Sequence, residues 1–171
     1  DGWQDQYYGG YRLEARYPGL AEAAEQTVGL ILTYNGKPAS TYFSAHSGGY
    51  TTNSAWSGST PPYLVSQPDP WSLKAPPYSA SSAGPGWNWT YTISPASLSA
   101  KVNNKLKDVA TGKTFDVGLV GRIEIVNRDT GDPTSHVRTL RLTGEKGVAT
   151  VSATSLKSCL GLRSTLILTI T

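Results

Sequence analysis

The residues best suited to chemistry lie in one short stretch. It holds a histidine, several hydroxyl side chains and two adjacent glycines, in the order Ser44-Ala45-His46-Ser47-Gly48-Gly49-Tyr50-Thr51. Glycine permits positive φ angles and a close approach of the backbone to a ligand. Polar and aromatic side chains on such a loop are typical of a binding site. A tight turn between two strands, with His46 exposed to solvent, fits the same pattern.

Other reactive side chains are few and scattered. His46, His136 and Cys159 are far apart in the sequence and lack the spacing of metal ligands, so we expect no metal site. Ser47 next to His46 is compatible with a nucleophile, but the chain has no Gly-x-Ser-x-Gly nucleophile elbow. We expect His136 to be a surface residue of a strand. Cys159 lies in an apolar run, which predicts a buried, unreactive thiol.

Composition narrows the classes of ligand. The chain has 171 residues, which suits one domain able to bury a core without disulfides or metals. Its net charge is +3 and its basic residues are scattered, which argues against nucleic-acid binding. It has 5 Trp and 10 Tyr against 2 Phe; rings of this kind suit carbohydrates, although they also fill β-rich cores. No apolar run approaches the ~20 residues that span a bilayer.

A β-hairpin is expected to position the loop. Two strand-like runs, 30–34 and 37–43, are joined by Asn35-Gly36, the dipeptide that favours a type I′ turn. A Pro followed by strong helix formers predicts a helix over 18–25. After the loop, residues 57–86 are rich in Pro, Gly and Ser, and ordered loops of that length are usually functional. Within them, Pro68-Asp69-Pro70-Trp71 predicts a turn with an aromatic anchor.

The rest of the chain predicts an α+β fold. A strand is expected over 87–93, and Ser94-Pro95 predicts the start of a helix that reaches about residue 106. The last third predicts a meander, a helix and a closing strand: strands 117–126, 136–143 and 148–151, helix 154–160 ended by Gly161, and strand 166–170. Regular βαβ alternation is missing, so we expect β-hairpins and a meander with a few short helices packed on a mixed sheet.

The loop is also part of a longer pattern. The stretch 42–51, followed by Trp56, by Pro62-Tyr63-Leu64 and by Asp69-Pro70, resembles the hallmark segment of the stage II sporulation protein D (SpoIID, amidase-enhancer) family of bacterial cell-wall proteins. The segment 160–165, Leu-Gly-Leu-Arg-Ser-Thr, resembles the closing motif of that family. The resemblance covers nearly the whole chain and implies a single SpoIID-like domain over 1–171.

The resemblance implies the activity of a lytic transglycosylase on peptidoglycan. One carboxylic acid protonates the glycosidic oxygen and then acts as base on the sugar's own 6-hydroxyl, which gives a 1,6-anhydro product. In the family this acid is a glutamate in a segment similar to Glu-Ala-Leu-Lys-Ala-Gln-Ala, which does not occur here. Glu22 and Glu25 lie downstream of the Gln6-x-Tyr8 landmark and are expected to be solvated helix charges. Because the chain also starts at Asp1 without a Met, we expect a truncated or processed fragment that lacks the catalytic glutamate and is inactive alone.

The resemblance also implies a glycan-binding groove. Tyr50 would have a supporting catalytic role, in which it hydrogen-bonds or polarises the substrate. The implied substrate-binding residues are Gln6, His46, Ser47, Gly48, Gly49, Thr51, Trp56, Arg163 and Ser164. Trp56 would stack on a sugar or anchor the loop, and Arg163 would equally serve as a charge at a helix end. Some family members bind zinc near the N-terminus, but Gln4 and Asp5 stand where His and Cys are expected, so we expect no cofactor.

The expected partners are peptidoglycan glycan strands and other cell-wall hydrolases, with no nucleic acid and no membrane span. The chain is expected to be a monomer located outside the cell or in the cell wall. Two alternatives remain open: a non-catalytic cell-wall-binding or amidase-stimulating module, and a β-rich structural module without a ligand.

Overall fold

The computed structural model describes residues 15–42, 46–53, 61–74 and 89–171. The chain forms two compact units, 1–42 and 43–171. The single domain expected over 1–171 stays a prediction. Within the described residues, no helix is both long and apolar enough to cross a membrane.

The first unit contains a helix and a small hairpin. Helix α2, Pro18–Gln26, matches the predicted 18–25 within one residue. Strands β1, Thr33–Tyr34, and β2, Lys37–Pro38, pair antiparallel. Asn35 and Gly36 between them have φ angles of 50° and 74°, as a type I′ turn requires. The hairpin is confirmed, but its strands are shorter than predicted, although the Ala39 amide still donates to the Leu32 carbonyl at 2.8 Å beyond the paired residues.

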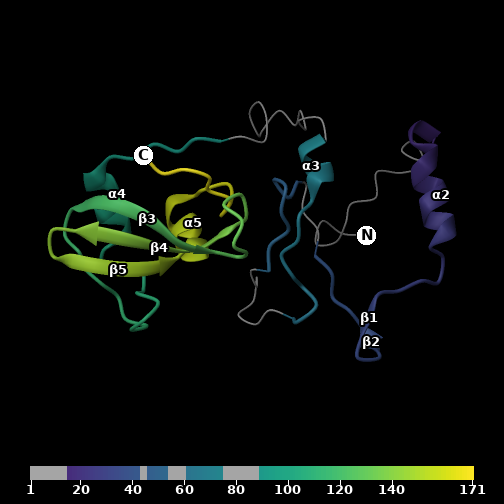
Figure 1. The fold of residues 1–171 in the computed structure, drawn as a ribbon, viewed down its shortest axis with the longest axis horizontal. Helices are drawn as coiled ribbons and strands as arrows, with labels where there is room; N and C mark the ends of the chain where they lie inside the picture. The colour runs from purple at the N-terminus through teal and green to yellow at the C-terminus, as the bar shows by residue number, and fades with distance from the viewer. Residues whose placement is uncertain (1–14, 43–45, 54–60, 75–88) are drawn as a thin grey trace. The chain divides into compact units, whose positions relative to one another are not determined.

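The second unit contains a three-stranded antiparallel sheet (Figure 1). Its strands are β3, Val120–Arg128, β4, Val137–Gly144, and β5, Gly147–Ser152, in that order. The predicted meander and the α+β class are confirmed. The expected mixed sheet is corrected, because the described strands of both sheets pair antiparallel.

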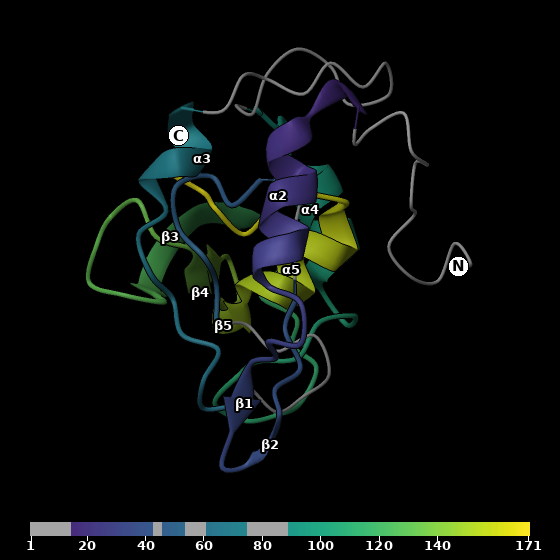
Figure 2. The same ribbon diagram turned by 90° about the vertical axis from the view of Figure 1, so that its right-hand side faces the viewer.

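One face of this sheet carries the core. The pairing places Leu140 beside Ile125 and Val151, and Leu142 beside Ile123 and Ala149. Helices α4, Pro95–Val102, and α5, Ala153–Leu160, contribute to the same buried cluster. The two helices contact each other as well as the sheet (Figure 2). The buried apolar side chains are Leu98, Val102, Val117, Val120, Val137, Leu140, Leu142, Ala149, Val151, Ala153, Leu156 and Leu160.

Serine caps start both core helices. The Ser94 hydroxyl accepts a hydrogen bond from the Ser97 amide at 3.2 Å, and the Ser152 hydroxyl accepts one from the Ser155 amide at 3.1 Å. Helix α5 ends at Gly161 in the left-handed conformation, with φ 71°. The predicted start of α4 at Ser94-Pro95 and the Gly161 stop are confirmed, α5 starts one residue before the predicted 154, and α4 ends at Val102 and not near 106.

Three local predictions are wrong. The described part of 87–93, residues 89–93, is not a strand, and neither is 166–170. In the second case the Arg128 guanidinium donates to the carbonyls of Ile167, at 2.8 Å, and Leu168, at 3.4 Å, so a side chain takes the place of a neighbouring strand. Cys159 is half-buried rather than buried, and its thiol donates to the Lys101 carbonyl at 3.1 Å.

Candidate functional site

The stretch 46–51 is held by a short antiparallel pairing with residues 66–69. Tyr50 forms an isolated bridge with Pro68. The Thr51 amide donates to the Gln67 carbonyl at 2.9 Å, and the Asp69 amide donates to the Gly49 carbonyl at 2.8 Å. This second segment continues into helix α3, Pro70–Lys74. The loop is therefore part of a two-segment unit.

Two hydroxyls and one carboxylate form a compact triangle at the start of this unit. The hydroxyls of Ser47 and Ser72 each lie 2.7 Å from Oδ2 of Asp69 and 2.9 Å from each other. Hydrogen bonds from Ser47 and then from Ser72 lower the pKa of Asp69. The carboxylate is consequently ionised at neutral pH and serves as an acceptor.

His46 holds the backbone of the same unit. Its Nε2 lies 2.7 Å from the Ser72 carbonyl, and its Nδ1 accepts from the Gly48 amide at 2.9 Å. Because a carbonyl only accepts, Nε2 carries the proton and the ring is the neutral Nε2–H tautomer. These bonds aim the ring at two main-chain groups, which suits a positioning role better than that of a general base for Ser47.

The paired glycines allow two leucines to approach the loop. Gly48 has φ 74°, and a Cβ built there would lie 2.6 Å from Cδ2 of Leu166. Gly49 has φ 103°, and its Cβ would lie 3.2 to 3.3 Å from Leu73 of α3. A side chain at either position would meet both backbone strain and a neighbour.

Tyr50 reaches the turn between β3 and β4. Its hydroxyl donates to Oδ2 of Asp132 at 2.6 Å, across 82 residues of sequence. The hydrogen bond to Asp132, followed by desolvation, raises the pKa of Tyr50. Hydrogen bonds from Thr134 and then from Tyr50 lower the pKa of Asp132. The Tyr50 hydroxyl thus stays protonated and donates a hydrogen bond to the Asp132 carboxylate. Its oxygen can still accept a hydrogen bond from a ligand.

His136 joins three separate segments and was missed as a site residue. It is only 7% exposed, so the prediction of a surface strand residue is wrong. Its Nε2 lies 3.1 Å from the Tyr50 carbonyl, and its Nδ1 lies 2.9 Å from the Thr165 hydroxyl. The carbonyl requires a proton on Nε2, so Nδ1 accepts from Thr165. The buried ring thus provides the hydrogen bonds that water would otherwise make to the Tyr50 carbonyl and the Thr165 hydroxyl.

A second acid of the same turn holds the end of the loop. Oδ2 of Asp129 accepts from the Thr52 hydroxyl at 2.7 Å and from the Asn53 amide at 3.3 Å. Its side chain is 0% exposed, and its Oδ1 pairs with Nε of Arg138 at 3.3 Å. The strand following the turn therefore supplies the cation that offsets a buried carboxylate.

The closing motif lies against the loop through Thr165 and Leu166. The Val137 amide donates to the Thr165 carbonyl at 2.9 Å, which ties the motif to the start of β4. Ser164 turns the chain locally, because its hydroxyl accepts from the Leu166 amide at 3.0 Å. Arg163 is exposed. The two landmarks at opposite ends of the sequence thus meet in space.

The predicted site residues divide into three groups. The loop residues 46–51 lie together, and Leu166, which follows the closing motif, contacts them. Arg163 and Ser164 lie in the closing motif itself, where the Ser164 hydroxyl bonds locally to the Leu166 amide. Gln6 and Trp56 lie outside the described residues. The sequence reasoning did not select the side chains that hold the loop by hydrogen bonds, which are three acids, two hydroxyls and one histidine: Asp69, Asp129, Asp132, Ser72, Thr165 and His136. Asp69 carried a signal, since it belongs to the hallmark segment, and so did the predicted turn at 129–133.

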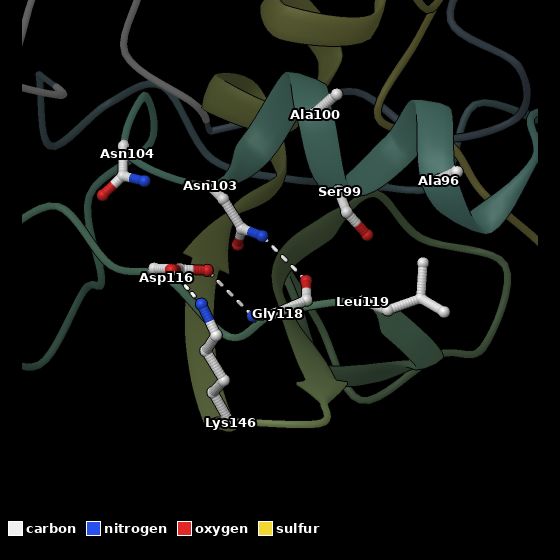
Figure 3. Close-up of a pocket in the computed structure, with 9 residues that line it drawn as sticks. All are labelled: Ala96, Ser99, Ala100, Asn103, Asn104, Asp116, Gly118, Leu119 and Lys146. Atoms are coloured by element: carbon white, nitrogen blue, oxygen red, sulfur yellow. Dashed lines mark hydrogen bonds and ion pairs between the residues drawn. The ribbon is translucent and has the colours of Figure 1, made fainter.

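A second polar cluster surrounds a surface hollow of about 550 Å³ beside α4 (Figure 3). The Asn103 amide nitrogen donates to the Gly118 carbonyl at 2.7 Å, and Nζ of Lys146 pairs with Asp116 at 2.7 Å. Figure 3 shows the Asn103 amide directed at the Gly118 backbone and the Lys146 ammonium directed at the Asp116 carboxylate. Since their polar groups bind within the cluster, its evident role is to hold the turn before β3 against the β4–β5 turn. Within the described residues, no group of three or more His, Cys, Asp or Glu is placed to bind a metal.

The carboxylates of the loop predict acid lability. The pKa values of Asp69 and Asp132 lie below the ordinary 3.8, so their hydrogen bonds stabilise the fold above that pH. This stabilisation is lost as pH falls through the folded-state pKa values. We expect the Tm of the wild type to fall between pH about 4 and about 2, and to fall less in Asp69→Asn/Asp132→Asn, as measured by circular dichroism. Parallel curves for both proteins would contradict this assignment.

Comparison with known proteins finds three similar bacterial proteins. Stage II sporulation protein D of Bacillus subtilis is 36% identical over 98 residues, or 57% of this chain. The amidase enhancer of the same organism is 35% identical over 98 residues, or 56% of the chain, and stage II sporulation protein D of Bacillus amyloliquefaciens is 44% identical over 62 residues. The chain spans 26%, 12% and 18% of these relatives' lengths. No family model and no solved structure matches it.

Proposed function

Because this chain is related to the stage II sporulation protein D family over about half of its length, we propose that it acts at the bacterial cell wall, where its 43–171 unit binds the glycan strands of peptidoglycan. The binding surface comprises the stretch 46–51 with Asp69 and Asp132. A location in the cell wall or outside the cell is part of the same proposal.

The observation that carries the proposal is a pair of ionised carboxylates fixed to the loop. Asp69 and Asp132 are each bonded to a loop hydroxyl, at 2.7 and 2.6 Å, and both remain partly exposed. An ionised carboxylate offers about four lone-pair positions. Asp132 accepts three hydrogen bonds, from the Tyr50 hydroxyl and from the amide and hydroxyl of Thr134, so its Oδ2 can accept one more donor. Asp69 accepts from both serine hydroxyls and from the amides of Ser72 and Trp71, so it contributes negative charge beside that position. Sugar hydroxyls are donors that such acceptors bind strongly. Acceptors held in place beforehand bind with less loss of side-chain entropy.

The same carboxylates are poorly suited to proton donation. A general acid in glycosidic cleavage must be protonated near neutral pH, which requires a raised pKa. The pKa values of Asp69 and Asp132 are instead lowered. In a reaction of the lytic transglycosylase type these residues would hold the strand, and another carboxyl would protonate the glycosidic oxygen.

Co-sedimentation with purified peptidoglycan and with peptide-stripped glycan strands tests the proposal. We expect the wild type to bind both, and Asp132→Asn to bind about tenfold more weakly, because a charged acceptor is lost. Asp116→Asn is the matched control: Asp116 also has a lowered pKa but lies in the second polar cluster. Equal loss in both variants, or none in Asp132→Asn, would contradict the proposal. Mass spectrometry of released sugars would detect anhydro products.

A second candidate function is stimulation of a cell-wall amidase. It is favoured by one relative, which is named an amidase enhancer. Here the chain would raise the rate at which an added amidase releases peptide stems. If it does so without sedimenting with glycan strands, this function replaces the first.

A further inference from the structure

Helix α3 carries Trp71, the most exposed aromatic side chain among the described residues, beside the loop. Trp71 is 73% exposed, which corrects the prediction of an aromatic anchor at this turn. A tryptophan left open on the surface forgoes one of the largest apolar contributions that a side chain makes to a core. Leu30, Leu32 and Leu73 are exposed to a similar degree, at 71%, 71% and 68%, so what distinguishes Trp71 is an aromatic ring at a fixed place beside the loop.

The residues on either side of Trp71 are fixed to the loop. Asp69 and Ser72 belong to the hydroxyl–carboxylate triangle, and the Ser72 carbonyl lies 2.7 Å from Nε2 of His46. Leu73 lies against Gly49, where an added Cβ would meet it at 3.2 Å. The backbone of Trp71 is therefore held at a set position relative to the proposed binding surface.

Among the described residues, Lys74 places its ammonium group over the Trp71 ring. Nζ of Lys74 lies 4.6 Å from the ring centroid, a cation–π contact that restricts ring rotation. Because a cation occupies only one face and the residue is still 73% exposed, ring surface remains open to a ligand. A flat aromatic face beside carboxylate acceptors matches a pyranose ring, which has an apolar C–H face and a rim of hydroxyl donors.

We propose that Trp71 is a stacking platform for one sugar ring of a glycan strand that donates a hydroxyl to Asp132 and lies beside Asp69. This inference rests on the proposed function and adds a residue that the hallmark pattern did not indicate. Stacking supplies apolar contact area, while the carboxylates orient the ring.

The test compares Trp71→Ala with Trp71→Phe in binding to peptide-stripped glycan strands. We expect Trp71→Ala to bind three- to tenfold more weakly and Trp71→Phe, which keeps a ring, to retain most of the affinity. Tyr91→Ala is the matched control, because Tyr91 is also exposed, at 40%, but lies on the segment before α4. Quenching of tryptophan fluorescence by the strands should be present in the wild type and reduced in Trp71→Phe.

Failure of this inference is distinguishable from failure of the proposed function. If Asp132→Asn weakens binding while Trp71→Ala binds as the wild type does, the stacking platform is wrong and the binding surface stands. If the wild type does not bind glycan strands, both proposals fall. An equal loss of affinity in Trp71→Ala and Tyr91→Ala would also overturn the platform, because it would show that any exposed aromatic ring contributes to binding non-specifically.

Discussion

Replacing His136 with alanine is expected to lower the free energy of unfolding by roughly 2–4 kcal/mol, the largest effect predicted for a residue of the site. The imidazole is buried and hydrogen-bonded to the Tyr50 carbonyl and the Thr165 hydroxyl. Its loss leaves both groups without this partner and creates a cavity. Urea unfolding followed by circular dichroism would measure the change.

Two further substitutions separate the hydrogen bonds from the packing. Thr165→Val keeps the shape of the side chain but removes the donor to Nδ1, so we expect a smaller loss of roughly 1–3 kcal/mol. His136→Gln offers an amide in place of the ring and should recover part of the loss. If His136→Ala unfolds at the same urea concentration as the wild type, His136 does not join the three segments energetically.

Gly48→Ala is expected to cost about 1–3 kcal/mol through two causes that act together. An L-residue at φ 74° is strained, and its Cβ would lie 2.6 Å from Cδ2 of Leu166. We also expect the variant to bind glycan strands more weakly, since the loop must shift to admit the methyl group. Thermal unfolding and co-sedimentation on the same preparation measure the two effects.

Gly112→Ala is the matched control for Gly48→Ala. Gly112 has a similar φ of 67°, but a Cβ there has nothing within 4 Å, so only the backbone strain of about 1–2 kcal/mol applies. The excess cost at Gly48 measures the contact with the closing motif. Adding Leu166→Ala to Gly48→Ala should remove that excess, and a strictly additive double variant would show that the contact has no energetic weight.

His136 and Leu166 explain why the hallmark loop depends on distant parts of the chain. His136 precedes β4, and Leu166 follows α5, yet both contact residues within 48–50. The loop residues thus serve mainly to connect segments. The proposed function rests on the partly exposed carboxylates beside the loop and on the ring of Trp71.

The sequence by itself determined the features that depend on a few neighbouring residues. Asn35-Gly36 predicted the type I′ turn because few other dipeptides tolerate positive φ twice. Ser94-Pro95 predicted the start of α4, and Gly161 predicted the end of α5, since capping uses only side chains and backbone within one helical turn. The hallmark motif likewise identified the correct relatives.

Tertiary structure alone decided which groups meet at the loop. The predicted strand 166–170 did not form, because the Arg128 side chain binds its carbonyls from a distant position in the sequence. His136 was expected on the surface because its neighbours resemble a half-exposed strand, but the closing motif and Tyr50 bury it. The contact between Tyr50 and Asp132 spans 82 residues, and no periodicity or spacing encodes such a distance. Local sequence specifies backbone shape, whereas the partners of a polar side chain depend on how the whole chain packs.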